Sequence, residues 1–154
     1  MLWIISFDIY PGETYGLVGE SGSGKSTTGR SIIRLYDPTE GTILFNGEDI
    51  SKKLTAKQEK MLRSDMQMVF QDPMASLNPH KKILDTIAMG LDAHHPHMDQ
   101  KERVERVSKM MEMVGLNPAY MNRYPNQFSG GQRQRIGLGR ALIMNPKLVI
   151  AERQ

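Results

Sequence analysis

Short apolar runs separated by polar segments predict four strands in this chain. The runs occupy residues 14–18, 42–47, 66–70 and 147–151, and a glycine or a polar stretch ends each of them. Asn46-Gly47, at the end of the second run, is a pair typical of a tight turn. Apolar runs of this length, bounded by turn signals, are typical of strands buried inside a domain.

Amphipathic segments between these runs predict helices. Residues 24–35 form the first predicted helix, and Ile32, Ile33 and Tyr36, which directly follows it, can share one face. A second, mostly polar helix is expected over residues 54–65. Each predicted helix separates two predicted strands, so the first half of the chain alternates between the two kinds of element.

The middle of the chain has a different pattern, and residues 81–125 are expected to be largely helical. Asp99 is placed to cap a helix, and Glu102 stands at the spacing of a capping box. Gly115 is placed to end that helix at its C-terminus. The apolar positions between them recur at helical spacing: Val104, Val107, Met111 and Val114.

A further helix is expected to begin after Ser129 and to run to Met144, where Asn145-Pro146 stops it. Strands that alternate with helices predict an α/β domain with a largely parallel sheet, and the middle helical block is an insertion into it. The predicted division is a core of residues 1–74 and 126–154 with a helical subdomain of residues 75–125.

The overall composition fits one globular domain of 154 residues. Hydrophobic residues make up 39% and charged residues 24%, and the formal net charge is +3. This mildly basic balance suits an anionic partner such as a nucleotide and is too small to indicate nucleic acid. The chain has no cysteine, which excludes disulfides and thiolate metal sites, and no apolar run approaches a membrane span.

A glycine-rich segment, GESGSGKST, joins the first predicted strand to the first predicted helix. Gly22 and Gly24 lack a Cβ, so the backbone can curl and direct its N–H groups at phosphate oxygens. Lys25 supplies a point charge, and the Ser26 hydroxyl is an oxygen ligand for Mg²⁺. The motif therefore predicts a site for a nucleotide, formed by Gly19, Glu20, Ser21, Gly22, Ser23, Gly24, Lys25, Ser26 and Thr27.

That motif leaves the reaction open, since kinases, switch GTPases and transport ATPases share it. A second motif, FSGGQRQR, begins at Phe128 and places Ser129 and two glycines at a predicted helix start. Such a start binds anions through exposed N–H groups and the helix dipole. Taken alone, it is equally compatible with ordinary turn chemistry and solvated arginines.

The order of three motifs resembles that of the nucleotide-binding subunits of ATP-binding-cassette (ABC) transporters. GESGSGKST resembles the Walker A motif, VFQDP the Q-loop, and FSGGQRQRIGLGRAL the family signature, with Phe128 where leucine is commonest. The strings QDPMASLNP and RYPNQFSGGQRQRIG resemble the oligopeptide and dipeptide importer branch. The resemblance extends from about Ser6 to Ala151.

The resemblance implies roles for individual residues and a P-loop NTPase core with an inserted helical subdomain. Lys25 and the glycines of the first motif bind the phosphates of ATP. Ser26 and Gln71 hold Mg²⁺, and Gln71 also senses the γ-phosphate. The second motif acts in trans on a nucleotide of a second copy, through Ser129, Gly130, Gly131 and Gln132.

The same resemblance implies partners and a location. A second ATP-binding subunit completes the nucleotide sandwich, and membrane-spanning permease subunits contact the helical block and QDPMASLNP. The protein is then peripheral to the cytoplasmic face of the cell membrane. Its implied function is to couple ATP hydrolysis to import of oligopeptides or dipeptides, and nucleic acid is not an expected partner.

The chain departs from the family pattern at its last strand. Relatives place Asp-Glu after this strand, whereas Ala151 is followed here by Glu152 and Arg153. Glu152 stands in place of the metal-binding aspartate, and Arg153 cannot act as a base because it stays protonated. The aromatic residue that stacks on adenine lies farther upstream in the family.

These departures favour an incomplete ABC ATPase domain, truncated at both ends, with weak or absent hydrolysis. The alternative is a non-enzymatic nucleotide-binding or interaction fragment. A third hypothesis is an unrelated P-loop enzyme such as a small-molecule kinase, against which the second motif and the Q-loop both count.

Overall fold

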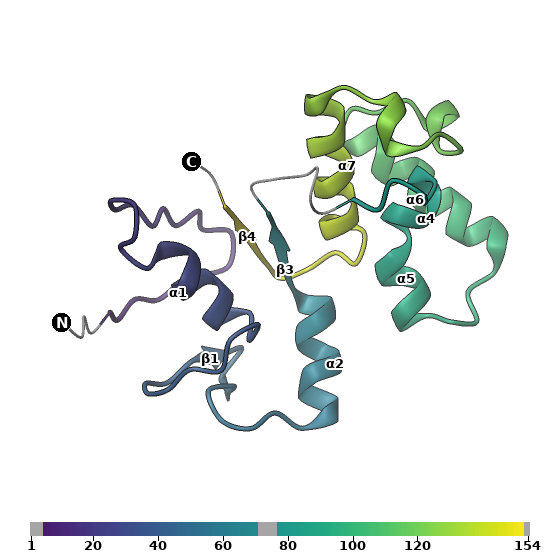
Figure 1. Ribbon diagram of the computed structural model, residues 1–154. Coiled ribbons are helices and arrows are strands. Elements are labelled where there is room, and N and C mark those ends of the chain that lie inside the picture. Colours follow the sequence, from purple (N-terminus) through teal and green to yellow (C-terminus); the bar gives the residue numbers. More distant parts are fainter. Residues whose placement is uncertain (1–4, 71–76, 153–154) are drawn as a thin grey trace.

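The computed structural model describes residues 5–70 and 77–152 of the chain (Figure 1). Helices and strands alternate in the first part, helices follow, and one strand closes the described region. In chain order the elements are α1 (Lys25–Ile32), β1 (Leu44–Phe45), β2 (Glu48–Asp49), α2 (Ala56–Asp65), β3 (Met66–Val69), α4 (Ile83–Ile87), α5 (Met89–His94), α6 (Gln100–Met113), η1 (Pro118–Tyr120), η2 (Pro125–Gln127), α7 (Gly130–Leu142) and β4 (Leu148–Ala151).

Two pairs of strands form in the described part of the chain. β1 and β2 are a short antiparallel hairpin, and Asn46 and Gly47 form its turn with φ values of 50° and 81°. β3 and β4 run parallel, with Met66 opposite Leu148 and Val69 opposite Ala151. Three of the four predicted strands, the second, third and fourth, are therefore confirmed, the second as a two-residue strand.

The prediction of a strand at residues 14–18 is wrong. These residues belong to no strand of the described part, and Val18 is 90% exposed. Upstream, the chain turns at residues 10–13, and the rings of Phe7 and Tyr15 stack with centroids 4.8 Å apart. A strand needs a neighbour for its N–H and C=O groups, and an apolar run does not provide that neighbour.

Helix α1 is shorter than the predicted 24–35. Arg34 follows it with φ of 59°, a left-handed conformation that ends the helix. Its guanidinium donates to the carbonyl groups of Ile50 and Lys52 and to Asp37. Three acceptors outside the helix thus stabilise a conformation that a non-glycine residue seldom adopts.

The helical prediction for the middle of the chain is confirmed. Asp99 caps α6 by accepting from the N–H groups of Lys101 and Glu102, and Gly115 follows that helix with φ of 72°. α7 begins after Ser129 as predicted and ends at Leu142, short of Met144. In the described residues no helix is long and apolar enough to cross a membrane.

The buried side chains form two separate clusters. One lies among the helices and includes Ile87, Met111 and Ile136, while the other joins β1, α2 and β3 through Phe45, Leu62 and others. α7 packs against α4 and α6 in the first cluster and also contacts β3. Figure 1 shows α1 on one side of the β3–β4 pair and α7, with α4, α5 and α6, on the other.

Candidate nucleotide site and signature helix

The glycine-rich motif forms a tight loop that leads directly into α1. Gly22 and Gly24 have φ values of 81° and 91°, in the left-handed region that only glycine enters without strain. The N–H of Ser23 donates to the carbonyl oxygen of Glu20 at 3.2 Å, which closes the turn. The backbone therefore has the alternating curvature typical of an anion-binding nest.

Lys25 folds back over this loop. Its Nζ donates to the carbonyl oxygens of Gly19 and Glu20, both at 2.6 Å, and lies 3.4 Å from the Ser23 hydroxyl. An ammonium group has three donors. The lysine charge is thus held at the mouth of the loop by carbonyl groups, which a phosphate oxygen can replace as acceptors.

Glycine at position 19 fits closely against the Ser23 side chain. A Cβ there would lie 2.7 Å from the Ser23 Oγ and 3.8 Å from the Lys25 Cδ. A real Cβ does not approach a hydroxyl oxygen this closely, so any other residue would displace Ser23. The first and fifth positions of the motif are packed against each other.

The start of α1 lacks a side-chain cap. Gly24 is its N-cap residue, and it makes no capping hydrogen bond through a side chain. The first N–H groups of a helix have no partner within the helix, and their dipole end is positive. Together with the exposed hydroxyl of Ser26, this end of α1 is suited to hold an anion and its accompanying cation.

The second glycine motif forms a capped start on α7. The Ser129 hydroxyl accepts from the N–H of Gln132 at 3.3 Å, and the Gln132 Oε1 accepts from the N–H of Ser129 at 2.9 Å. This reciprocal capping box fixes the first turn. Gly130 and Gly131 are exposed, and a Cβ on either would meet no atom within 4 Å.

Buried residues anchor this second motif to the helical cluster. Phe128, directly before the cap, is 5% exposed and packs edge-on against Tyr120, with ring centroids 6.3 Å apart. Arg135 donates to the carbonyl oxygen of Gly115 at 3.0 Å, which ties α7 to the end of α6. The glycines are therefore presented to solvent from a rigid base.

The two glycine motifs do not meet within one chain. Figure 1 places α1, which follows the first motif, and α7, which follows the second, on opposite sides of the β3–β4 pair. Each motif lies at an exposed helix start, uncapped by a side chain on α1 and capped by Ser129 on α7. A single chain therefore carries two separate candidate anion sites.

Of the residues predicted for Mg²⁺, Ser26 and Glu152 belong to the described part of the chain. Gln71 and Arg153 lie outside the described residues. The N–H of Glu152 donates to the Val69 carbonyl oxygen at 3.0 Å, which continues the ladder past β4. The Glu152 side chain is 12% exposed, and its Oε1 is buried without a hydrogen bond.

The chemistry of these residues fits a hard cation. Ser26 offers an exposed hydroxyl on the first turn of α1, and Glu152 offers a carboxylate oxygen that lacks a hydrogen-bond partner. Oxygen ligands of this kind are those that Mg²⁺ prefers.

Arg30 on α1 is a charged neighbour of Glu152 that the motif analysis missed. Its Nη2 lies 3.3 Å from Oε1 and 3.4 Å from Oε2 of that carboxylate. A hydrogen bond to Tyr36 and the nearby carboxylate raise the pKa of Arg30 above its ordinary value. The sequence signal that could have found Arg30 is its position four residues after Ser26, which places it one turn further along the same face of a helix.

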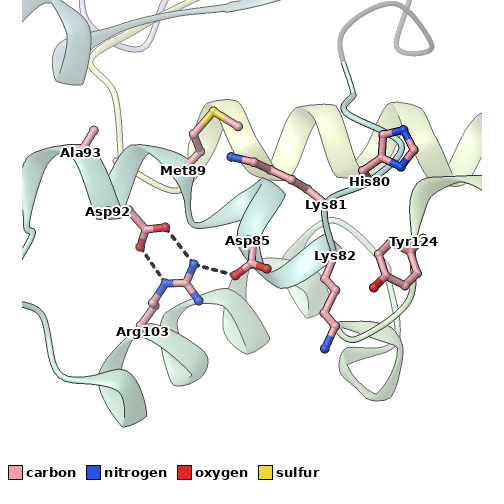
Figure 2. Close-up of a pocket in the computed structure, with 9 residues that line it drawn as sticks. All are labelled: His80, Lys81, Lys82, Asp85, Met89, Asp92, Ala93, Arg103 and Tyr124. Atoms are coloured by element: carbon pink, nitrogen blue, oxygen red, sulfur yellow. Dashed lines mark hydrogen bonds and ion pairs between the residues drawn. The ribbon is translucent and has the colours of Figure 1, made fainter.

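A second arrangement of charges lies in the helical part and was also missed. Arg103 lines a pocket and pairs with Asp92 and Asp85, and His80, Lys81 and Tyr124 line the same pocket (Figure 2). These carboxylates raise the pKa of Arg103, with the hydrogen bond to Asp92 as the largest cause. No sequence spacing links residues on three different helices.

A phosphate-binding loop on an α/β fold with a second capped glycine motif defines a nucleotide-binding protein of the P-loop class. The ABC transporter family profile matches residues 2–152. The chain belongs to the ABC transporter family.

Three relatives show where within this family the similarity is high. The chain is 57% identical over 148 residues to the oligopeptide transport ATP-binding protein OppF of Bacillus subtilis (strain 168). It is 52% identical to the dipeptide transport ATP-binding protein DppF of Lactococcus lactis subsp. cremoris (strain MG1363). It is also 52% identical to the glutathione import ATP-binding protein GsiA of Escherichia coli O157:H7.

These matches cover 96% of this chain but only 48%, 48% and 23% of the three relatives. The chain spans about half the length of OppF and DppF. Among solved structures, the dimeric structure of MJ0796, a bacterial ABC transporter cassette, superposes with a TM-score of 0.82 at 33% identity. That match covers 94% of this chain and 62% of the MJ0796 chain.

Proposed function

We propose that this chain is the ATP-binding part of an ABC importer that couples ATP binding and hydrolysis to the uptake of oligopeptides or dipeptides. The observation that carries the proposal is the Lys25 ammonium, held by loop carbonyls beside the uncapped start of α1. The names of the relatives supply the substrate class.

The proposed binding step uses the loop as the structure shows it. Phosphate oxygens take the place of the Gly19 and Glu20 carbonyls as acceptors for Lys25, and the backbone turned by Gly22 and Gly24 donates N–H groups to them. The loop is already curved, so little ordering is needed when the nucleotide binds.

Ser26, Gln71 and Glu152 are the residues that we propose hold Mg²⁺. A bound Mg²⁺ neutralises phosphate charge during phosphoryl transfer. Ser26 contributes its hydroxyl, and Glu152 contributes the carboxylate oxygen that lacks a hydrogen bond. We assign Gln71 to the γ-phosphate side on the resemblance alone.

A second copy, or a second ATP-binding subunit, is the proposed partner of the signature motif. Ser129, Gly130, Gly131 and Gln132 would then bind the γ-phosphate of the partner's nucleotide. Two features support this: the two motifs lie on opposite sides of the sheet, and the solved relative MJ0796 is dimeric.

Sedimentation with an unhydrolysed ATP analogue tests the pairing. Gly131→Asp adds a negative charge at the proposed anion site, and the open space around Gly131 accepts the side chain. We expect the parent chain to dimerise with the analogue and the variant to stay monomeric. Equal dimerisation of both proteins would contradict the role in trans.

Permease subunits are the proposed partners of the helical subdomain, residues 75–125, which we place apart from a core of residues 1–74 and 126–154. A buried cluster among the helices, separate from the one around β1, α2 and β3, supports a distinct helical part, and that cluster also takes in Phe128, Ile136 and Ile143 from the 126–154 segment. In this assembly the chain sits peripherally at the cytoplasmic face of the membrane. Nucleic acid is not a proposed partner.

The alternative of a non-enzymatic interaction fragment is less favoured by the comparisons, because the relatives are named as transport ATP-binding proteins. A small-molecule kinase is disfavoured by the family match. The importer hypothesis accounts for both glycine motifs with one reaction.

Titration calorimetry with Mg-ATP tests the nucleotide site. Lys25→Ala removes a charge-assisted hydrogen bond, so we expect affinity to fall by at least about tenfold. Lys57→Ala is the matched control, because Lys57 is an exposed lysine on α2. The same affinity in the parent and in Lys25→Ala would overturn the proposed role of the loop.

A further inference from the structure

Arg30 contacts the one carboxylate that the structure places at the end of β4. It follows Ser26 by four residues on α1, so both side chains leave the same side of the helix. The Arg30 guanidinium donates to Glu152 Oε2 at 3.4 Å and lies 3.3 Å from Oε1. Arg30 therefore connects the helix of the phosphate loop to Glu152.

Close packing between α1 and β4 supports this contact. A Cβ on Gly29, the residue before Arg30, would lie 3.3 Å from the Ile150 Cγ2, so a larger residue at position 29 would crowd that side chain. The Glu152 N–H is bonded to the Val69 carbonyl oxygen. The pair therefore joins a packed face of α1 to a residue whose backbone is bonded to β3.

The ion pair leaves one oxygen of the Glu152 carboxylate without a hydrogen bond. Glu152 Oε1 is buried and accepts no hydrogen bond, although the guanidinium is within ion-pair distance. A buried acceptor without a partner is unfavourable. Both Arg30 contacts are also longer than the roughly 2.7–2.9 Å of a strong charge-assisted bond, so the carboxylate is oriented without being saturated.

We propose, on the basis of the function proposed above, that Arg30 is a positioning residue that holds the Glu152 carboxylate against α1 and leaves Oε1 as the oxygen for the divalent cation of the bound nucleotide. The positive charge of Arg30 opposes a nearby cation. Its side chain is 34% exposed, however, so solvent screens that repulsion, whereas the orientation of a buried carboxylate depends on direct contact.

The test measures by calorimetry the affinity for ADP in saturating Mg²⁺ and the affinity in chelator. The ratio of these two affinities is the gain that Mg²⁺ gives to ADP binding. Arg30→Met should reduce this gain by about tenfold or more, as loss of a residue that orients a metal ligand does, and leave affinity in chelator unchanged. Arg30→Lys should restore part of the gain, because it keeps the charge but lacks the planar fork.

Glu152→Gln should remove the same gain, and the double variant Arg30→Met/Glu152→Gln should lose no more than Glu152→Gln alone. Arg106→Met is the matched control, since Arg106 forms an exposed pair with Glu102 on α6. It should leave both affinities at the parent values. A gain that disappears in this control as well would contradict a specific role for Arg30.

Four other outcomes overturn the inference. An unchanged gain in Arg30→Met means that Arg30 does not orient the carboxylate, and a larger gain means that it competes with the cation. An equal loss of affinity in Mg²⁺ and in chelator means that its role is structural only. A parent chain that binds ADP without any Mg²⁺ effect refutes the inference alone, whereas a chain that binds no ADP refutes the proposed function.

Discussion

Arg103 on α6 donates to both carboxylate oxygens of Asp92 on α5, from Nε at 2.7 Å and from Nη2 at 2.8 Å. The same Nη2 donates to Asp85 on α4 at 3.0 Å. The arginine side chain is only 12% exposed, so the guanidinium itself is largely shielded from water (Figure 2). One side chain thus joins three helices of the proposed subdomain.

Arg103→Met should destabilise the protein by about 2 kcal/mol, since bidentate charge-assisted bonds are lost and two carboxylates are left facing each other. The loss is limited because Asp85 and Asp92 are 46% and 47% exposed and stay solvated. Urea unfolding measures it. Arg106→Met, which breaks an exposed pair, should cost less than about 1 kcal/mol. Equal effects of the two variants would contradict this account.

Gly19→Ala should weaken nucleotide binding by about tenfold, or about 1.4 kcal/mol, because its Cβ would displace Ser23 and the turn around Lys25. Gly16→Ala is the matched control, since a Cβ there meets nothing within 4 Å. Ser23→Ala should restore part of the affinity of Gly19→Ala by removing the clashing hydroxyl. Calorimetry with Mg-ATP compares the parent chain, Gly16→Ala, Gly19→Ala and the double variant Gly19→Ala/Ser23→Ala. If the double variant binds no better than Gly19→Ala, the clash with the Ser23 hydroxyl is not the cause of the loss.

Gly137→Ala should raise the free energy of unfolding by up to about 1 kcal/mol, the difference in helix propensity between the two residues. A Cβ at position 137 meets no atom within 4 Å. Gly90→Ala should gain less or lose stability, because its Cβ would lie 2.9 Å from the Met144 Cγ. The midpoints of urea unfolding compare both variants with the parent chain. A Gly137→Ala protein that is less stable than the parent would contradict the prediction.

Asp65 should contribute a pH-dependent part of the stability. Lys147 donates to its carboxylate at 2.8 Å, and this bond, followed by one from Ser64, lowers the pKa of Asp65 below its ordinary 3.8. The native state therefore binds the proton less tightly than the unfolded state. Its contribution is complete above that ordinary value and is lost as pH falls through the lower native value.

The matching variant is Asp65→Asn. Urea unfolding of both proteins between neutral and acidic pH should show the parent chain more stable near pH 7. The difference should shrink below about pH 4. A constant difference across the whole range would show that the carboxylate charge contributes nothing.

Phosphate release from saturating Mg-ATP should be far below the ~10 s⁻¹ median of enzymes. Arg153 occupies the position of the family's glutamate and stays protonated, so it cannot accept a proton from the attacking water. General-base assistance is typically worth 10²–10⁴-fold. Lys25→Ala serves as the blank, and Lys25-dependent turnover near the median would refute the prediction.

Local sequence signals located most elements, though not all their ends. Ser129 and Asp99 cap the predicted helices, and Asn46-Gly47 forms the predicted turn, because capping and turn formation depend on residues only a few positions apart. The glycines of the loop at 22 and 24 adopt the predicted curvature for the same reason. The early end of α1 was missed, since two of the three acceptors that stabilise Arg34, the carbonyl groups of Ile50 and Lys52, are distant in sequence.

The sequence by itself determined the family, the α/β class, and both glycine motifs, since each is encoded in contiguous residues and their order. Only the tertiary structure decided that residues 14–18 form no strand, that Arg30 faces Glu152, and that Arg103 joins three helices. Those outcomes depend on which segments, distant along the chain, come to lie side by side, and apolar periodicity carries no information about such neighbours.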